Sequence, residues 1–206
     1  MNKILAFFGA FNPPTVAHIE LARFAKEQTA SDGVMFVPSK SVYIRDTQGK
    51  DYAFDDSARL SMLRAAAKER EWMLVTDIEL AKERQPRTYH TLCKIKEQGY
   101  SPSLLLGSDK LPELEHKWLY VNEMATEFGI VCLARGNDEC ERIISESPFL
   151  SSISQYIKVV KTPDSMKNVS STKVRKLLAC GAKREELGMY LTPEVLNFVT
   201  EDKNET

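Results

Sequence analysis

The sequence has few cysteines and no excess of charge of one sign. Cysteine accounts for four of the 206 residues, Cys93, Cys132, Cys140 and Cys180, with no Cys-x-x-Cys pair and no histidine at metal-binding spacing. We therefore expect neither a disulfide framework nor a zinc site, and a reducing, cytoplasmic compartment. The 28 basic and 29 acidic residues leave a net charge of -1, which predicts no binding to nucleic acid or to an anionic membrane surface.

Long apolar runs are also missing. The longest, Ile4 to Phe11 and Phe128 to Ala134, are far shorter than the roughly 20 residues that span a bilayer. The first leads directly into Asn12-Pro13-Pro14 without a signal-peptide cleavage site. We expect no membrane segment and no export signal. With 43% apolar residues, the chain can bury a full core as one domain over residues 1–206.

Short apolar runs alternate with helical patterns along the chain. Most of the runs are continuously apolar, as in strands covered on both faces. The arrangement predicts an α/β fold, a Rossmann-like, doubly wound and mostly parallel sheet with helices on both faces. The expected strands are Lys3 to Phe8, Gly33 to Val37, Trp72 to Thr76, Ser103 to Gly107, Gly129 to Leu133 and Tyr156 to Val160.

Helices with a period near 3.6 lie between these strands. The clearest, Asp56 to Glu69, would place Leu60, Leu63 and Ala67 on one face, with Asp55, Asp56 or Ser57 as its cap. A helical extension is expected from about residue 182, and the polar stretch Ser39 to Asp55 reads as a long connecting loop. The other expected helices are Thr15 to Gln28, Thr88 to Gln98, Ser171 to Cys180 and one beginning at Pro193.

The segment Gly9 to His18 follows the first expected strand, where ligands bind in open α/β sheets. Gly9 permits close backbone approach, and Pro13 and Pro14 stiffen the turn. Thr15 and His18 are three residues apart and would face the same way beside a helix N-terminus, which is a natural anion site. The alternative is a capped helix with a packed histidine.

A second polar segment, Asn168 to Arg175, opens a helix after the last strand. Ser170 and Ser171 are candidate caps, and Thr172 adds a hydroxyl. Arg175 lies three residues after Thr172, so its guanidinium can return to the start of the helix. Hydroxyls, backbone amides and a forked cation together suit a polyphosphate, although ordinary capping with a solvated arginine explains the same residues.

The third segment, Gly107-Ser108-Asp109, ends a buried strand. Asp109 could hold ribose hydroxyls or simply cap the next helix.

Taken together, these motifs resemble a known family. Gly9 to His18 is similar to the Gly-x-Phe-x-Pro-x-(His/Thr)-x-x-His signature of the nucleotidyltransferase superfamily, and Ser170 to Arg175 is similar to its Ser-Ser-Thr-x-x-Arg signature, about 150 residues later. Further segments resemble the nicotinate/nicotinamide mononucleotide adenylyltransferases, so the resemblance covers nearly the whole chain. These segments are Arg59 to Leu63, Asp77 to Leu80, Thr88 to Leu92, Gly107 to Asp109, Trp118, Arg135 and Tyr190 to Val195.

The resemblance implies adenylyl transfer from ATP to the 5′-phosphate of a pyridine mononucleotide in NAD biosynthesis, with release of pyrophosphate and with Mg²⁺ bridging phosphate oxygens. It implies no metal ligand from the protein. The catalytic residues would be Thr15, His18 and Arg175. The ATP-binding residues would be Gly9, Ala10, Phe11, Gly107, Asp109, Ser170, Ser171 and Thr172. The acceptor-binding residues would be Asn12, Lys40, Arg45, Thr88, Tyr89, Trp118 and Arg135.

Several alternatives stay open at this point. Trp118 could stack on a pyridine ring or fill the core, and Lys40, Arg45 and Arg135 could be solvated surface charges. Thr88-Tyr89-His90 departs from the Ser-Tyr-Thr of bacterial nicotinate-specific members, which leaves acid-versus-amide preference open. Two other functions also stay open: a related transferase with another acceptor (phosphopantetheine, flavin mononucleotide) and a non-catalytic nucleotide-binding module. Assembly into a homo-oligomer is open as well.

Overall fold

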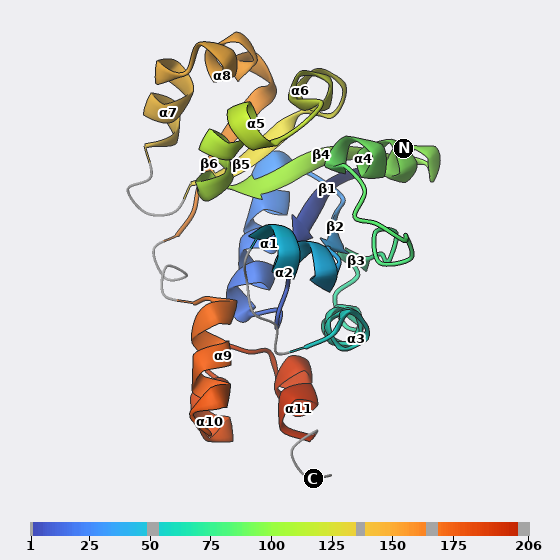
Figure 1. Ribbon diagram of the computed structural model, residues 1–206, viewed down its shortest axis with the longest axis vertical. Coiled ribbons are helices and arrows are strands. Elements are labelled where there is room, and N and C mark those ends of the chain that lie inside the picture. Colours follow the sequence, from blue (N-terminus) through green and yellow to red (C-terminus); the bar gives the residue numbers. More distant parts are fainter. Residues whose placement is uncertain (1, 49–53, 135–138, 164–168, 202–206) are drawn as a thin grey trace. The chain divides into compact units, whose positions relative to one another are not determined.

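The computed structural model describes residues 2–48, 54–134, 139–163 and 169–201. Its sheet has six strands in the order β3-β2-β1-β4-β5-β6, which is the order of a doubly wound Rossmann sheet. β1 pairs with β4, β4 with β5 and β5 with β6 in parallel. The α/β prediction is confirmed (Figure 1). The strands are β1 (Asn2–Gly9), β2 (Gly33–Pro38), β3 (Met73–Val75), β4 (Tyr100–Gly107), β5 (Ile130–Ala134) and β6 (Ile157–Lys161).

Each of the six expected strands overlaps an observed one. β2 and β5 are buried along their whole length, as their uninterrupted apolar sequences predict for strands covered on both faces. Five expected helices are also present: α1 (Val16–Thr29), α3 (Asp56–Ala67), α4 (Thr88–Glu97), α9 (Ser171–Ala179) and α11 (Pro193–Glu201).

Several helices were not expected from the sequence. The polar stretch Ser39 to Asp55, predicted to be a long loop, begins with helix α2 (Ser41–Gln48), and residues 49–53 lie outside the described ranges. Two turns of 3-10 helix, Ser108–Lys110 and Ser154–Tyr156, were also not expected. The other unexpected helices are α5 (Leu111–Lys117), α6 (Val121–Phe128), α7 (Cys140–Glu146) and α8 (Pro148–Ser152), whereas α10 (Arg184–Leu187) lies in the stretch where a helical extension was expected.

Helix α3 buries a different face from the one predicted. Asp55 is its N-cap, as expected, and accepts a 2.7 Å hydrogen bond from the Ala58 N–H. The fully buried residues are Arg59, Met62, Leu63 and Ala66, whereas the sequence predicted Leu60, Leu63 and Ala67. The apolar periodicity missed this face because one of its members carries a full charge.

The chain divides into two compact units, each made of segments far apart in the sequence. The first comprises residues 1–8, 21–35 and 86–167, and the second 9–20, 36–85 and 168–206. This division does not test the predicted single domain with its helical extension, which stays a prediction. The four cysteines are free thiols. Within the described ranges, no helix combines the length and the apolar character needed to cross a bilayer.

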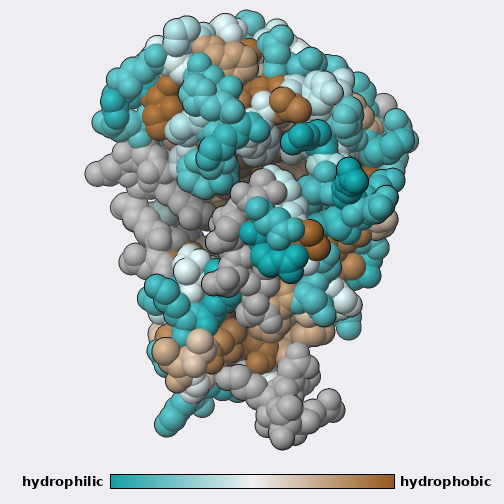
Figure 2. Space-filling model, viewed as in Figure 1, coloured by the Kyte–Doolittle hydropathy of each residue, from teal (hydrophilic) through white to brown (hydrophobic). Residues whose placement is uncertain are grey.

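The surface of the second unit carries some apolar side chains. In Figure 2, hydrophobic residues gather over the C-terminal helices α9 to α11. Met189, which is 62% exposed, belongs to the short segment that joins α10 to α11.

Candidate active site

The loop after β1, Gly9 to Thr15, folds around the side chain of Phe11. Phe11 has a left-handed backbone, with φ 45°, and its buried ring contacts His18 edge-on at 5.3 Å between ring centroids. A Cβ atom at Gly9 would lie only 3.0 Å from this ring. Gly9 therefore permits close approach, as expected, and the group that approaches it is the Phe11 ring, which a Cβ would push aside by a few tenths of an ångström.

Thr15 and His18 contact each other at the start of α1, as their spacing predicts. The Thr15 hydroxyl lies 2.8 Å from Nδ1 of His18, and the Thr15 backbone N–H donates to the same nitrogen at 3.1 Å. Because Nδ1 accepts this bond, a neutral ring carries its proton on Nε2. His18 can therefore donate a hydrogen bond from the opposite side of its ring.

The start of α9 packs against the same loop. Ser171 donates from its hydroxyl to the Pro13 carbonyl at 2.7 Å, and Arg175 donates through Nη1 to the Asn12 carbonyl at 2.9 Å. The two signature segments, although far apart in sequence, therefore meet within the second unit. All these residues belong to it.

The local geometry at the start of α9 also follows the sequence prediction. Ser170 is the N-cap, and its hydroxyl accepts from the Lys173 N–H at 3.3 Å. Nη2 of Arg175 lies 3.3 Å from the Thr172 hydroxyl, so the guanidinium returns to the start of its own helix. A cation, a hydroxyl and a helix N-terminus are thus assembled at one place, which suits an anion.

Asn12 is buried in this loop with its side-chain amide unsatisfied. It is 1% exposed, and neither Oδ1 nor Nδ2 has a hydrogen-bond partner among the described residues. Leaving such a group without a partner costs about 1–3 kcal/mol. A bound ligand is one way to satisfy it.

The basic residues near α2 are engaged with protein groups. Lys40 donates through Nζ to the Leu80 carbonyl at 2.9 Å, and its backbone N–H donates to Oε1 of Gln85 at 2.9 Å. Gln85 in turn donates to the buried carboxylate of Glu79. Arg45 lies at the surface, 2.8 Å from Asp46.

Asp77 and Glu79, which the sequence left without a role, both contact other side chains. Asp77 forms an exposed ion pair with Arg64 at 3.1 Å. Glu79 supports the loop that binds Lys40, through Gln85.

The first unit contains the segment Gly107-Ser108-Asp109. A Cβ at Gly107 would lie 2.6 Å from a carboxylate oxygen of Asp109, so a larger residue here would make the Asp109 side chain turn away. The 3-10 turn that begins at Ser108 has Gly107 as its N-cap, and α5 has Lys110, neither with a side-chain cap bond. Capping by Asp109 is thus not observed, and its carboxylate is 70% exposed.

An aromatic cluster surrounds Tyr89, in the first turn of α4. Its ring stacks on Tyr120 at 5.2 Å with 28° between the planes, and His90 lies 5.2 Å from Tyr120. The Tyr89 hydroxyl donates to Glu127 at 2.9 Å, which raises the pKa of Tyr89 to about 12. Trp118 follows α5 and is partly exposed. The predicted Arg135 lies outside the described residues.

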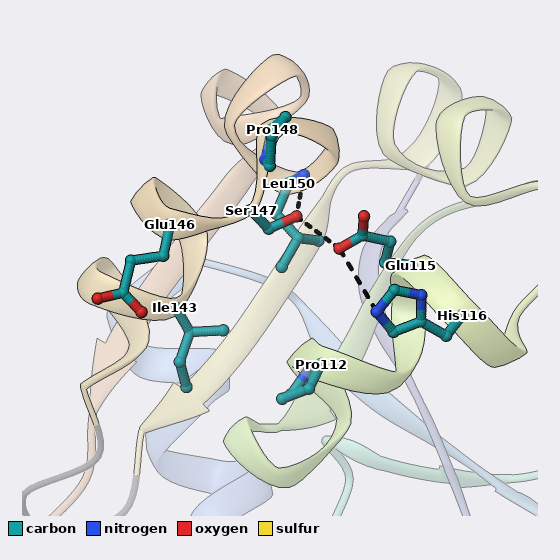
Figure 3. A pocket seen from close by; sticks show the side chains of 8 residues that line it. All are labelled: Pro112, Glu115, His116, Ile143, Glu146, Ser147, Pro148 and Leu150. Atoms are coloured by element: carbon teal, nitrogen blue, oxygen red, sulfur yellow. Dashed lines mark hydrogen bonds and ion pairs between the residues drawn. The ribbon is translucent and has the colours of Figure 1, made fainter.

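A hollow of about 320 Å³ in the first unit contains none of the predicted site residues (Figure 3). It lies among α5, α7 and α8, where Ser147 donates to Glu115 at 2.7 Å and His116 lies 3.8 Å from the same carboxylate oxygen. In a catalytic triad the histidine contacts the serine. Here Ser147 also accepts from the Leu150 N–H at 3.1 Å, as the cap of α8, and its role is structural.

Arg59 is a further residue to which the sequence assigned no role. It is fully buried and donates to the carbonyls of Ala10 and Ser39. The available signal was a basic residue within three or four positions of Met62 and Leu63 on the same helix face.

Comparisons with known proteins agree with the geometry. A model of the Cytidylyltransferase-like family matches residues 6–177. The sequence is 30% identical over 184 residues to a probable nicotinate-nucleotide adenylyltransferase of Neisseria meningitidis, covering 87% of this chain and 88% of the relative. It is 26% identical over 212 residues to nicotinamide/nicotinic acid mononucleotide adenylyltransferase 2 of Caenorhabditis elegans, and this match covers 94% of this chain and 93% of the relative.

Solved structures share the fold. The Plasmodium falciparum nicotinic acid mononucleotide adenylyltransferase complexed with APC matches with a TM-score of 0.75 and 17% identity, over 98% of this chain and 96% of that one. The same protein complexed with NaAD matches with a TM-score of 0.74. From the family model and the bacterial relative together, the chain belongs to the cytidylyltransferase-like family and, within it, to the nicotinate/nicotinamide mononucleotide adenylyltransferases.

Proposed function

We propose that this chain transfers the adenylyl group of ATP to the 5′-phosphate of nicotinate mononucleotide, forming the dinucleotide and pyrophosphate in NAD biosynthesis. One observation carries the proposal. The loop Gly9 to Thr15, whose last residue contacts His18, meets the start of α9, which carries Thr172 and Arg175, within the second unit. Relatives named for this activity support it.

In the reaction, a phosphate oxygen of the mononucleotide attacks the α-phosphorus of ATP. A new P–O bond forms, the bond from the α-phosphorus to the bridging oxygen breaks, and that oxygen leaves with the electron pair as part of pyrophosphate. A phosphomonoester's second pKa is near 6, so the nucleophile is already ionised at neutral pH and needs no general base. The protein contributes alignment and charge stabilisation.

His18 would donate from Nε2 to the α-phosphate, because Thr15 holds Nδ1 as an acceptor. Arg175 and Thr172 would bind the departing β- and γ-phosphates. A guanidinium has five N–H groups, and the bonds to Asn12 and Thr172 leave others for a ligand. Ser170 and Ser171 would contribute backbone N–H groups of the helix N-terminus, since their hydroxyls already bind Lys173 and Pro13.

Mg²⁺ would arrive with ATP as part of the substrate. Among the described residues, the donors that we propose for the phosphates, which are Thr15, His18, Thr172 and Arg175, include no carboxylate. Mg²⁺ commonly keeps its waters and binds substrate phosphates. We therefore assign no protein ligand to the metal.

For the acceptor, Asn12 has the best support, because its buried amide has no partner among the described residues. We further propose that Trp118 stacks on the pyridine ring, that the start of α4 at Thr88 and Tyr89 faces the ring's carboxylate, and that Lys40, Arg45 and Arg135 serve its phosphate. For ATP, Gly107 and Asp109 would hold the ribose hydroxyls. The four free thiols fit a protein of the cytoplasm.

The proposal is tested by supplying Mg-ATP with nicotinate mononucleotide, nicotinamide mononucleotide or phosphopantetheine in parallel and measuring pyrophosphate release. We expect release with a pyridine mononucleotide and none with phosphopantetheine. Arg175→Ala should abolish most of it. Arg142→Ala is the matched control, because Arg142 forms exposed ion pairs on α7.

Release with phosphopantetheine alone would show a related transferase with another acceptor. ATP binding without release of pyrophosphate with any acceptor would show a non-catalytic nucleotide-binding module.

Trp118→Ala tests the binding of the acceptor separately from the binding of ATP. It should raise KM for the pyridine mononucleotide about ten- to a hundredfold, the worth of one aromatic stack, and leave KM for ATP within a few-fold.

A further inference from the structure

Arg59 places a full charge inside the second unit. Its side chain is 0% exposed and shares the buried face of α3 with Met62, Leu63 and Ala66. Removing a guanidinium from water is unfavourable unless hydrogen bonds and an opposite charge compensate it. An apolar side chain would fill this position without that cost. The contacts that the guanidinium makes must therefore compensate this cost.

These contacts join three segments. Arg59 donates through Nη1 to the Ala10 carbonyl and through Nη2 to the Ser39 carbonyl at 2.7 Å. Nη2 also lies 2.5 Å from Oδ1 of Asp56. The same carboxylate oxygen accepts from the Ser41 N–H at 2.8 Å.

The two carbonyls occupy corresponding places in the fold. Ala10 is the first residue after β1, and Ser39 is the first residue after β2. The Ser39 N–H also donates to the Gly9 carbonyl at 2.9 Å. Arg59 thus fastens together the beginnings of two loops that follow neighbouring strands. The planar guanidinium has several N–H donors and can bind the Ala10 carbonyl, the Ser39 carbonyl and the Asp56 carboxylate together. The single ammonium group of a lysine cannot reach all three acceptors equally.

The loop that begins at Ala10 is held from two directions. Helix α3 holds Ala10 through Arg59, and α9 holds Asn12 and Pro13 through Arg175 and Ser171. The loop then leads to Thr15 at the start of α1. Losing the first anchor would free the end of the loop that carries the left-handed residue Phe11.

We propose that Arg59 is a positioning residue for adenylyl transfer, which acts through Ala10 and Ser39 and touches no substrate. The inference rests on the proposed function. The Asp56 carboxylate offsets the charge of the guanidinium, so its effect is geometric. A shift of 1 Å in a reacting group can cost about a hundredfold in rate.

The test compares Arg59→Lys with Arg64→Lys, a control on the same helix whose arginine forms an exposed ion pair with Asp77. We expect Arg59→Lys to lower kcat at least about tenfold while KM for ATP changes less than threefold. Arg64→Lys should keep kcat within twofold. A folded Arg59→Lys protein with normal kcat would overturn the inference.

A second pair of measurements covers loss of folding. Asp56→Asn keeps the volume but weakens the anchor of the guanidinium, and we expect kcat to fall at least threefold in the folded protein. Arg59→Ala should regain part of its kcat when guanidinium is added at concentrations that do not unfold it. Unchanged kcat in Asp56→Asn, or no rescue of a folded Arg59→Ala, would contradict positioning by Arg59.

The two proposals fail in different ways. A wild-type protein that releases no pyrophosphate from either pyridine mononucleotide contradicts the proposed function. An active wild-type protein that its Arg59→Lys variant matches contradicts the role of Arg59 alone.

Discussion

At the scale of single residues, the orientation of the His18 ring determines what it can do. The Thr15 N–H donates to Nδ1 at 3.1 Å, so Nε2 is the hydrogen-bond donor of a neutral ring. We predict that His18→Ala lowers kcat about a hundredfold, the scale for losing one preorganised donor to a charged transition state.

The measurement is steady-state pyrophosphate release, with circular dichroism to show that the variant is folded. Thr15→Val supplies a graded comparison. It removes only the hydroxyl and keeps the backbone bond to His18, so its effect should be smaller. Near-normal turnover of folded His18→Ala would exclude this histidine from the phosphate site.

Tyr89 gives a second prediction at this scale. Its hydroxyl donates to the Glu127 carboxylate, which raises its pKa from 10.0 to about 12. The folded pKa lies above the unfolded one, so the contribution of this bond to stability is complete below about pH 10 and disappears as the pH rises through about 12. The ionisation of tyrosine can be followed by its ultraviolet absorbance in the wild type and in Tyr89→Phe. The difference between the two titration curves should give Tyr89 a pKa near 12. Glu127→Gln should move it down, and a Tyr89 that ionises near 10 in the wild type would contradict the hydrogen bond.

At the scale of elements, the start of α3 depends on Asp55. Its carboxylate accepts from the Ala58 N–H at 2.7 Å, and losing an N-cap side chain costs about 1 kcal/mol. For a chain of this size, we predict that Asp55→Ala lowers Tm by about 2–4 °C. Asp55→Asn should keep most of the stability because asparagine also caps helices. Equal destabilisation by both substitutions, measured by thermal unfolding, would count against the capping role.

Asp56 makes the same helix sensitive to acid. Partial burial raises its pKa, but hydrogen bonds from Arg59 and the Ser41 N–H outweigh this effect and hold the pKa below its ordinary value. In the unfolded protein the pKa of Asp56 is near 4, and in the folded protein it is lower. The contribution of Asp56 to the free energy of unfolding is therefore present above about pH 4 and is lost as the pH falls through the pKa of the folded protein. Asp56→Asn should destabilise the protein more at pH 7 than at about pH 3.

Urea unfolding of the wild type and Asp56→Asn across this range checks the prediction. Asp46→Asn, which alters an exposed carboxylate paired with Arg45, is the control. A stability difference between wild type and Asp56→Asn that does not change with pH would contradict a lowered pKa.

The elements also show what sequence can predict. Strands such as β2 and β5 were predicted because an uninterrupted apolar run is itself the pattern of a strand buried on both faces. The Thr15–His18 and Thr172–Arg175 contacts were predicted because residues three apart meet within one helical turn. Both kinds of signal are local, and both are confirmed.

Contacts between distant segments could not be predicted in this way. The bonds from Ser171 to Pro13 and from Arg175 to Asn12 join residues more than 150 positions apart, and no spacing rule reaches that far. Helix α2 was missed because its sequence, Ser41 to Gln48, is largely polar. Arg59 was missed as a core residue because burial of a charge depends on partners that only the folded chain supplies.

At the scale of the whole molecule, the two units divide the predicted site residues between them. The residues assigned to phosphate transfer belong to the second unit, whereas Thr88, Tyr89, Asp109 and Trp118 belong to the first. The alternation of strands and helices predicts the fold but not this division, because each unit combines segments that are separated in the sequence. The predicted acceptor residues are divided in the same way, since Asn12, Lys40 and Arg45 belong to the second unit.

We predict that nicotinate mononucleotide is preferred over the nicotinamide form. The acceptors differ by a carboxylate against a carboxamide, and α4 begins at Thr88 with an N-cap residue, Arg87, that makes no side-chain cap bond. The uncapped N–H groups of a helix N-terminus favour an anion.

The kcat/KM for the acid at pH 7 should then exceed that for the amide at least about tenfold, or about 1.4 kcal/mol in transition-state binding. The acid-to-amide ratio of kcat/KM, compared between the wild type and His90→Gln, tests whether the exposed His90 beside Tyr120 adds to the preference. Equal efficiency with both acceptors would show dual specificity, and a tenfold preference for the amide would overturn the assignment of the acid as substrate.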